Sequence, residues 1–358
     1  MKNSVEKAKR IYAEIPELDL HYYGMKGYGI RDNKIKEGRP KFHLIDQDKL
    51  FSVVTLISSE DSPYAIHKDQ LTYKEKTLPF RVKFIGRNNY PRTYFFYRSI
   101  RNWIPTLDSE TILSLNFQPV CKGCDWCSRC DESGEILKNI NPEEGVEILN
   151  SRGVNFAEID KLTFVTGMYR DGGEVVNNIL KTVELIKKQG FRGRVLYIGS
   201  QIKDPSSVRR LIEGLENTPL KYAYTLETFT QREKMHVKKN GSLEKILFTL
   251  ERLKQTGIKE LEYSYMPGLD PLKDFNKWMP KFSKLARPHL SIFRSAEEEH
   301  ENLKTPEFLE DPISYLCSIR LAFEKEHGSP IYQNNLASLW GFPISRINPL
   351  FLTDKTSL

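Results

Sequence analysis

The sequence predicts an α/β fold in which six parallel strands alternate with helices over residues 110–295 of a 358-residue chain. Two observations support this prediction. Short runs rich in apolar and β-branched residues recur at regular intervals, and segments with apolar residues at helical spacing separate them. Strands that alternate with helices form parallel sheets with right-handed crossovers. Six strands are fewer than the eight of a closed barrel, so we expect an open barrel or a doubly wound sheet.

The individual elements follow from local patterns. The strands are expected at residues 112–117, 161–166, 194–199, 222–227, 261–266 and 289–293. The helices between them are expected at residues 142–149, 174–189, 206–215, 242–256 and 272–285. Asn141 and Ser242 are suitable N-caps, and Gly190 and Gly257 follow the ends of their helices. Because ligands gather at the carboxyl ends of parallel strands, we expect the functional site at that edge.

The segments on either side of this core have different patterns. Residues 1–105 read as an N-terminal α+β region of short strands and loops with no assigned role, and its clearest strand covers residues 50–57. Residues 106–300 form the expected core, and residues 301–358 form a helical extension with a helix at 313–326. Cys317 lies on that helix, where we expect a buried structural residue.

A basic and aromatic segment covers residues 81–101 and contains no acidic residue. Its basic residues are Arg81, Lys83, Arg87, Arg92, Arg98 and Arg101, and its aromatic residues are Phe84, Tyr90, Tyr94, Phe95, Phe96 and Tyr97. Such a segment is typical of a surface that binds nucleic acid or a phosphorylated substrate. The favoured interpretation is a hairpin that turns at Asn88-Asn89, with its aromatic residues in the core and its arginines in solvent.

Composition indicates a soluble globular protein, because 39% of the residues are hydrophobic and 28% are charged. The first ten residues have no apolar run behind them, so we expect no signal peptide. No apolar stretch approaches the roughly 18 residues of a membrane helix. Free thiols then favour a cytoplasmic location. The net charge of +7 permits an anionic substrate or nucleic acid without requiring either.

Four of the five cysteines lie within ten residues, directly after the first predicted strand: Cys121, Cys124, Cys127 and Cys130. Crowded thiolates select zinc or an iron–sulfur cluster. Zinc sites usually separate two C-x2-C pairs by a dozen or more residues. A C-x2-C-x2-C run instead places three thiolates on one four-iron cluster in bacterial ferredoxins. The spacing therefore favours an iron–sulfur cluster over a zinc site or a disulfide, with one iron that lacks a nearby protein ligand.

This cysteine loop, followed by five more strand–helix units, resembles the radical S-adenosylmethionine (SAM) superfamily. The family pattern is C-x3-C-x2-C, usually with an aromatic residue just before the third cysteine. Cys124-Asp-Trp126-Cys127 matches the second half, whereas Cys121 is separated from Cys124 by two residues and not three. The resemblance implies a partial (β/α)6 barrel. It also implies a [4Fe–4S] cluster on Cys121, Cys124 and Cys127, with Cys130 as an alternative ligand. Trp126 would then lie beside the SAM adenine.

The resemblance also implies SAM contacts at the ends of later strands. Gly167 and Met168 follow the second strand, where the family has a Gly-Gly-Glu-type turn against the SAM amino group. A literal Gly172-Gly173-Glu174 comes five residues later, and its alternative interpretation is a flexible loop before a helix. Met266, at the end of the fifth strand, resembles the turn that packs on the adenine, although a plain strand-ending turn explains it equally well.

On the fourth strand, Thr225 and Glu227 resemble residues that meet the ribose and methionine moieties of SAM. Strand alternation predicts that both side chains share one face of the sheet. A carboxylate on a barrel-facing position must be paired or functional, so the alternative for Glu227 is a buried ion pair with a lysine or arginine.

The activity implied by the resemblance is reductive cleavage of SAM to a 5′-deoxyadenosyl radical, which abstracts hydrogen from a small metabolite or natural-product intermediate. An electron donor such as flavodoxin or ferredoxin is implied as a partner. Modification of a peptide or RNA is the alternative within the family. Two alternatives of other classes stay open: an iron–sulfur electron-transfer protein, and a zinc-stabilised nucleic-acid-binding protein whose binding would depend on salt.

Overall fold

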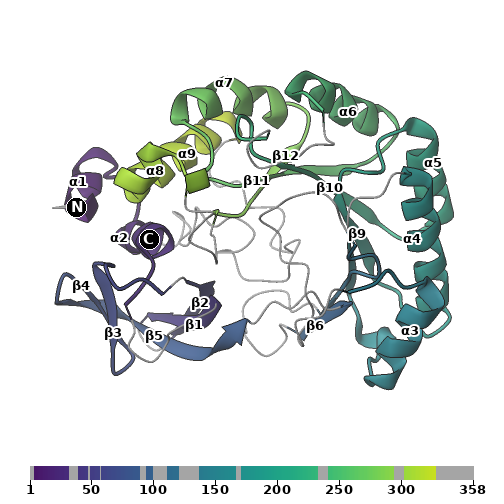
Figure 1. Cartoon of the computed structure of the whole chain (residues 1–358), viewed down its shortest axis with the longest axis horizontal. Coiled ribbons are helices and arrows are strands. Elements are labelled where there is room, and N and C mark those ends of the chain that lie inside the picture. The colour runs from purple at the N-terminus through teal and green to yellow at the C-terminus, as the bar shows by residue number, and fades with distance from the viewer. Residues whose placement is uncertain are drawn as a thin grey trace.

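The computed structural model describes residues 4–31, 39–46, 49–56, 58–88, 94–99, 111–120, 137–166, 171–232, 241–293 and 302–327. These residues form two sheets, one of seven strands and one of five, with helices packed along them. The larger sheet curves along one side of the molecule and the smaller sheet lies at the opposite side (Figure 1).

The larger sheet contains the six parallel strands that the sequence predicts. They are β7 (Thr111–Leu115), β8 (Lys161–Val165), β9 (Arg194–Gly199), β10 (Leu220–Glu227), β11 (Glu260–Tyr265) and β12 (Arg287–Leu290). Each pairs in parallel with the next strand along the chain. A doubly wound sheet would reverse its strand order at a switch point. The unbroken order β7 to β12 therefore decides for the open barrel.

Helices follow the strands and cover the outer face of this sheet (Figure 1). They are α3 (Pro142–Ser151), α4 (Gly172–Lys187), α5 (Pro205–Gly214), α6 (Leu243–Gln255) and α7 (Leu272–Ser283). The predicted caps are confirmed: the side chain of Asn141 accepts from the backbone N–H of Glu144 at 2.8 Å, and Ser242 caps α6. Gly190 and Gly257 have left-handed φ values of 99° and 109°, which glycine adopts without steric cost.

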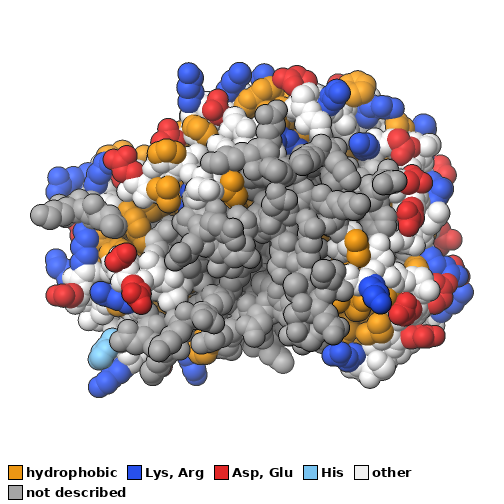
Figure 2. Space-filling view, in the orientation of Figure 1, with side chains coloured by type: hydrophobic (Ala, Val, Ile, Leu, Met, Phe, Trp, Pro, Cys, Tyr) orange, Lys and Arg blue, Asp and Glu red, His pale blue; other side chains and the backbone are white. Residues whose placement is uncertain are grey.

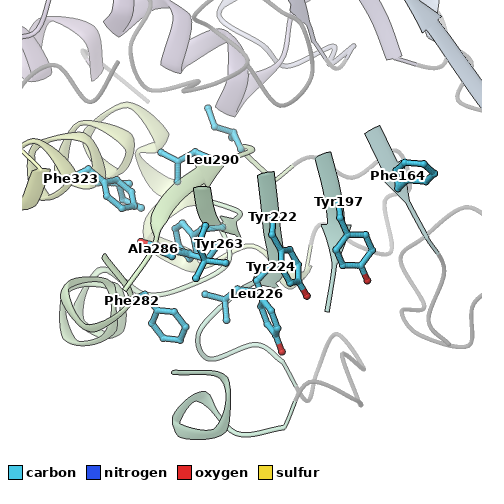
Figure 3. Packing of buried hydrophobic residues seen from close by; sticks show 14 of the residues in the cluster. Phe164, Tyr197, Tyr222, Tyr224, Leu226, Tyr263, Phe282, Ala286, Leu290 and Phe323 are labelled. Carbon is cyan, nitrogen blue, oxygen red and sulfur yellow. The ribbon is translucent and has the colours of Figure 1, made fainter. Parts of the chain in front are cut away.

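Tyrosines form much of the core between the sheet and its helices. Successive strands contribute Phe164, Tyr197, Tyr222 and Tyr263, and Figure 3 shows the Tyr197 and Tyr222 rings side by side. Their centroids lie 4.9 Å apart. Buried phenols require hydrogen-bond partners, and Tyr222 donates to the carbonyl of Ile202 at 2.9 Å. These hydroxyls help to fix the segments that follow the strands.

The opposite face of the sheet curls inward and carries charged side chains. Lys221 and Glu262 on neighbouring strands form an ion pair at 2.5 Å. Burial, together with the positive charges of Lys221 and Lys161, lowers the pKa of His289 to about 3. His289 is on β12 and Lys161 on β8, which a flat sheet would separate by roughly 19 Å. The influence of Lys161 on His289 is consistent with a strongly curved sheet, as an open barrel requires.

The N-terminal part is an antiparallel sheet with two helices. Its strands are β1 (Arg39–Asp46), β2 (Lys49–Thr55), β3 (Tyr64–His67), β4 (Gln70–Tyr73) and β5 (Lys76–Asn88), in the order β2-β1-β5-β4-β3. The strand expected at residues 50–57 is β2. The α+β character expected here is confirmed, because α1 (Ser4–Ile11) and α2 (Glu17–Tyr28) precede the strands, although the pattern of short strands and loops did not locate these helices. Residues 18–26 of α2 are all buried, so this helix shows no amphipathic stripe in the sequence.

The hairpin expected at Asn88-Asn89 is also wrong. β5 pairs with β1 and β4 in the smaller sheet, whereas β6 (Phe95–Ser99) pairs antiparallel with β7 in the larger one. An Asn-Asn turn signal is local and does not choose the strand that a segment pairs with. The aromatic residues are divided as well: Tyr94 and Phe95 are partly buried against the core, Phe84 is 43% exposed, and residues 89–93 lie outside the described part of the chain.

Two C-terminal helices complete the described structure, α8 (Pro306–Glu310) and α9 (Pro312–His327). The helix expected at residues 313–326 is therefore confirmed, and Cys317 is fully buried on it, as predicted. α9 packs against α2 and α7 and so joins the N-terminal part to the barrel. Within the described residues, no helix combines the length and the apolar character needed to cross a bilayer.

Candidate functional site

The segment that contains the four cysteines starts and ends at the carboxyl end of β7. Just before it, the backbone N–H of Val120 donates to Oδ1 of Asn139 at 3.0 Å. The backbone N–H of Ile140 donates to the carbonyl of Phe117 at 2.9 Å. Residues 117–120 and 139–140 are thereby held together, so both ends of the segment that carries the cysteines meet at this edge of the sheet.

Several predicted site residues lie outside the described part of the chain: Cys121, Cys124, Trp126, Cys127, Cys130, Gly167 and Met168. Thr225, Glu227 and Met266 are described. Among the described residues, no group of three or more His, Cys, Asp or Glu side chains is arranged to hold a metal ion. The assignment of the cluster ligands therefore stays a prediction from the cysteine spacing.

Glu227 ends β10 in an unusual environment. Its side chain is only 9% exposed, and its Oε2 has no hydrogen-bond partner among the described residues. Burial raises the pKa of this carboxyl to about 7, although the charge of Arg232 acts in the opposite direction. A buried carboxyl with a spare oxygen at the carboxyl end of a parallel strand is a candidate functional group.

The backbone at Glu227 departs from a regular strand. The register of β10 against β11 shifts between Thr225 and Glu227, and Glu227 has a left-handed φ of 72°. Left-handed backbone is costly for a residue with a Cβ and persists where surrounding contacts impose it. The alternation that placed Thr225 and Glu227 on one face is interrupted here, so that argument does not extend to Glu227.

Arg232 closes the loop after β10 back onto the strand. Its Nη1 donates to the carbonyl of Leu226 at 2.7 Å and to that of Thr228 at 3.4 Å. Arg232 is 8% exposed, and its positive charge lowers the pKa of the Glu227 carboxyl. The ion-pair alternative for Glu227 is thus met in part: an arginine lies close, yet Oε2 of Glu227 has no hydrogen-bond partner among the described residues.

Asp270, which follows β11, was missed by the sequence analysis. Its carboxylate is fully buried and accepts four hydrogen bonds from the loop after β10. The donors are the hydroxyls of Thr228 and Thr230 and the backbone N–H groups of Phe229 and Thr230, at 2.6 to 2.8 Å. A Thr-x-Thr pair some 40 residues before an aspartate gives no sequence signal, because nothing local links the two segments.

The backbone of Met266, at the end of β11, lies next to that of Glu227. Its backbone N–H donates to the carbonyl of Glu227 at 2.8 Å. The Met266 side chain packs beside Leu269, Phe293 and Leu303, in a cluster separate from the main core. The structure therefore brings Glu227 and Met266 together.

The Gly172-Gly173-Glu174 sequence forms the first turn of α4, with Asp171 as its cap, so the interpretation as a flexible loop is wrong. The Asp171 side chain accepts from the backbone N–H of Gly173 at 2.8 Å. A Cβ on Gly172 would lie 2.5 Å from the carbonyl oxygen of Gln201. Glycine is thus required where α4 begins close to the segment after β9.

A pocket lies near the carboxyl ends of β7 and β8, on the side of the sheet that the helices cover. Its walls include Leu115, Phe117 and Phe164 from this edge of the sheet and Ile179 and Thr182 from α4. The lining is mainly apolar, and neither Glu227 nor Met266 contributes to it. Glu227 and Met266 therefore belong to a different part of this edge.

No protein-family model matches the chain, and no curated protein matches it. Solved structures with a similar fold include the [FeFe]-hydrogenase maturase HydG, at 18% identity and a TM-score of 0.43 over 59% of this chain and 49% of that one. Coproporphyrinogen III oxidase HemN from Escherichia coli, a radical SAM enzyme, matches at 13% identity and a TM-score of 0.43 over 61% of this chain and 52% of HemN.

Methylornithine synthase PylB matches at 17% identity and a TM-score of 0.44, over 59% of this chain and 62% of PylB. The chain spans about half the length of the first solved structures that it matches. These similarities are too distant to transfer the activity of any of these proteins to this chain.

Proposed function

We propose that this protein is a radical SAM enzyme with a single [4Fe–4S] cluster. The observation that carries the proposal is the run of four cysteines directly after the first strand of an open six-stranded parallel barrel. Soft thiolates at this spacing suit an iron–sulfur cluster. The hydrogen bonds that join residues 117–120 to residues 139–140 support it, because they hold both ends of the cysteine segment at the edge where parallel barrels bind ligands.

The residues at this edge fit the two cofactors. Cys121, Cys124 and Cys127 would hold the cluster, with Cys130 as the alternative ligand. Trp126, Gly167, Met168, Thr225, Glu227 and Met266 would contact SAM. The fit rests on Glu227: its buried Oε2 has no hydrogen-bond partner among the described residues, and it suits an ammonium or hydroxyl donor of a ligand.

When bound, the cluster and SAM supply one-electron cleavage of SAM to a 5′-deoxyadenosyl radical that abstracts hydrogen from a substrate. The residues of this chain bind, orient and exclude water. Glu227 and Met266, which meet at the ends of β10 and β11, would hold SAM, and the positive charge of Arg232 would offset part of the negative charge of Glu227. Residues 106–300 form the catalytic core in this proposal, and residues 1–105 and 301–358 flank it.

The substrate class in this proposal is a small metabolite or natural-product intermediate, with an electron donor such as flavodoxin or ferredoxin, in a cytoplasmic enzyme. Acidic and basic side chains are interspersed along the helical rim in Figure 2. Mixed charge of this kind does not attract nucleic acid. The described rim in that view therefore gives no support to the nucleic-acid alternative.

The test is anaerobic reconstitution with iron and sulfide, reduction with dithionite, addition of SAM, and detection of 5′-deoxyadenosine by mass spectrometry. We expect 5′-deoxyadenosine from the native protein and from a Cys317→Ala control, and none from Cys124→Ala. A brown protein that makes none, and whose EPR signal SAM leaves unchanged, would be an electron carrier. A colourless protein with one zinc ion would support the nucleic-acid-binding alternative.

A further inference from the structure

The loop after β10 is built around the carboxylate of Asp270. Oδ1 accepts from the Thr228 hydroxyl at 2.7 Å and from both the backbone N–H and the hydroxyl of Thr230, at 2.7 and 2.6 Å. Oδ2 accepts from the backbone N–H of Phe229 at 2.8 Å. Hydrogen bonds to a buried ionised group are strong and directional. Three successive residues of the loop are thereby fixed relative to the end of β11.

The fixed loop determines where Glu227 and Arg232 lie. Glu227 comes immediately before the residues that Asp270 holds, and Arg232 comes shortly after them. The Thr228 hydroxyl accepts from the backbone N–H of Gln231 at 3.1 Å, which turns the chain back toward the strand. Arg232 then reaches the carbonyl of Leu226 at 2.7 Å. The turn around Asp270 therefore returns the Arg232 guanidinium to the end of β10.

The backbone of Asp270 is in turn hydrogen-bonded to a side chain of α9. The Tyr315 hydroxyl donates to the backbone carbonyl of Asp270 at 2.6 Å and accepts from the backbone N–H of Gly268 at 3.2 Å. Gly268 has a left-handed φ of 110° that favours glycine in this turn. A continuous series of buried hydrogen bonds therefore links Tyr315 on α9, through Asp270, to Thr228, the residue after Glu227.

We propose that Asp270 is a positioning residue for the cofactor site: its carboxylate holds the loop after β10 so that Glu227 and Arg232 are fixed for binding SAM. The inference rests on the proposed function, in which Glu227 contacts SAM. Asp270 acts through Glu227 and has no contact with the ligand of its own in this scheme. Preorganised groups bind more tightly because the ordering of their side chains precedes binding.

The experiment is a double-mutant cycle on SAM affinity, measured by equilibrium dialysis of the anaerobically reconstituted full chain. The variants are Asp270→Asn, Glu227→Gln and the double variant. We expect Asp270→Asn to weaken SAM binding at least tenfold in the native background and less than twofold when Glu227 is already Gln. Additive effects in the double variant would overturn the inference, because independent sites add.

Asp19→Asn is the matched control. Asp19 is as deeply buried as Asp270 but contacts Arg320 on α9, away from the loop after β10. We expect this control to lower the melting temperature and to leave SAM affinity within twofold. An equal loss of affinity in Asp19→Asn would show that Asp270 has only a structural role and would overturn the inference.

Two further outcomes are distinguishable. If Asp270→Asn does not fold, Thr230→Val removes one donor to the Asp270 carboxylate while its backbone donor stays, and the cycle is repeated with that variant. We expect a smaller loss of affinity that again disappears in the Glu227→Gln background.

Native protein that carries a cluster but does not bind SAM would overturn the proposed function, and this inference with it. SAM binding with an additive cycle would overturn the inference alone.

Discussion

Two buried acid–arginine arrangements in this protein differ in how completely their polar atoms are partnered. Between α2 and α9, Asp19 contacts Arg320 at 2.5 Å, and Arg320 also donates to Glu324 at 3.0 Å and to the Tyr23 hydroxyl at 3.2 Å. At the end of β10, Arg232 donates to backbone carbonyls, and Oε2 of Glu227 has no partner among the described residues. The first arrangement joins two parts of the chain. The second leaves one carboxyl oxygen of Glu227 able to accept a hydrogen bond from a ligand.

This difference indicates that the Asp19 arrangement stabilises the fold, whereas the Glu227 arrangement serves ligand binding. A buried carboxyl whose pKa is raised from 4.5 to about 7 destabilises the folded state near neutral pH by about 3 kcal/mol, at about 1.4 kcal/mol per pH unit. Proteins retain such costs mainly where a ligand later supplies the missing partner. The contrast with the fully partnered Asp19 therefore supports a ligand-binding role for Glu227.

The largest effect is expected from Arg320→Met. The substitution leaves Asp19 buried without its cationic partner, and breaking a buried pair in this way costs about 3–5 kcal/mol. The free energy of unfolding from urea titration measures it. Asp19→Asn combined with Arg320→Met should recover part of the loss, because the buried charge of Asp19 is removed together with its partner, although Glu324 still loses its contact with Arg320. A loss below about 1 kcal/mol would mean that the α2–α9 arrangement is not structural.

Glu227→Gln is expected to have the opposite sign. Below pH 4.5 the carboxyl is protonated in both the folded and the unfolded chain, so the native protein carries no cost. Between pH 4.5 and about 7 the unfolded chain ionises first, and stability falls until the folded carboxyl ionises too. Because glutamine stays neutral, the variant should gain up to about 3 kcal/mol at pH 8 and almost nothing at pH 4.

Urea titrations of the native protein and of Glu227→Gln at both pH values measure this difference. Affinity for SAM should fall in the same variant, so that stability and binding move in opposite directions. A gain that is equal at pH 4 and pH 8 would show that the pKa of Glu227 is not raised and would remove the contrast with Asp19.

A smaller effect is expected at the start of α4, where the constraint is steric. Gly172→Ala places a Cβ 2.5 Å from the carbonyl oxygen of Gln201 and should cost about 1–3 kcal/mol, since this oxygen belongs to the backbone and cannot rotate away as a flexible side chain would. Gly173→Ala is the matched control, because its Cβ would meet only the Asp171 side chain at 3.3 Å or more. Equal melting temperatures for the two variants would contradict this difference.

The smallest effect is expected from Lys7→Met. Lys7 and Asp311 form an ion pair at 3.1 Å that also links the N-terminal helices to the C-terminal ones, but the lysine side chain is 58% exposed. Solvent and salt screen such pairs, so the loss should be at most about 1 kcal/mol. A loss similar to that of Arg320→Met would show that exposure does not distinguish the two links between these helices.

Local patterns in the sequence predicted the barrel well. The strand at Arg194–Gly199 has the predicted bounds, and Asn141 and Ser242 cap the helices they were expected to cap. Periodicity, caps and glycine stops act over a few residues, so the chain expresses them without reference to distant contacts. The cysteine spacing is local for the same reason, and it led to the proposed cofactor.

Only the tertiary structure decided which strands pair and which polar groups meet. β5 and β6 belong to different sheets, and α2 is buried on all sides, because partners far along the chain cover them. The link from Asp270 to Thr228 and Thr230, and the left-handed backbone at Glu227, likewise arise from contacts about 40 residues apart. The sequence by itself determined the elements and the cysteine motif, whereas the buried polar contacts at the site depended on long-range packing, which short-range patterns do not encode.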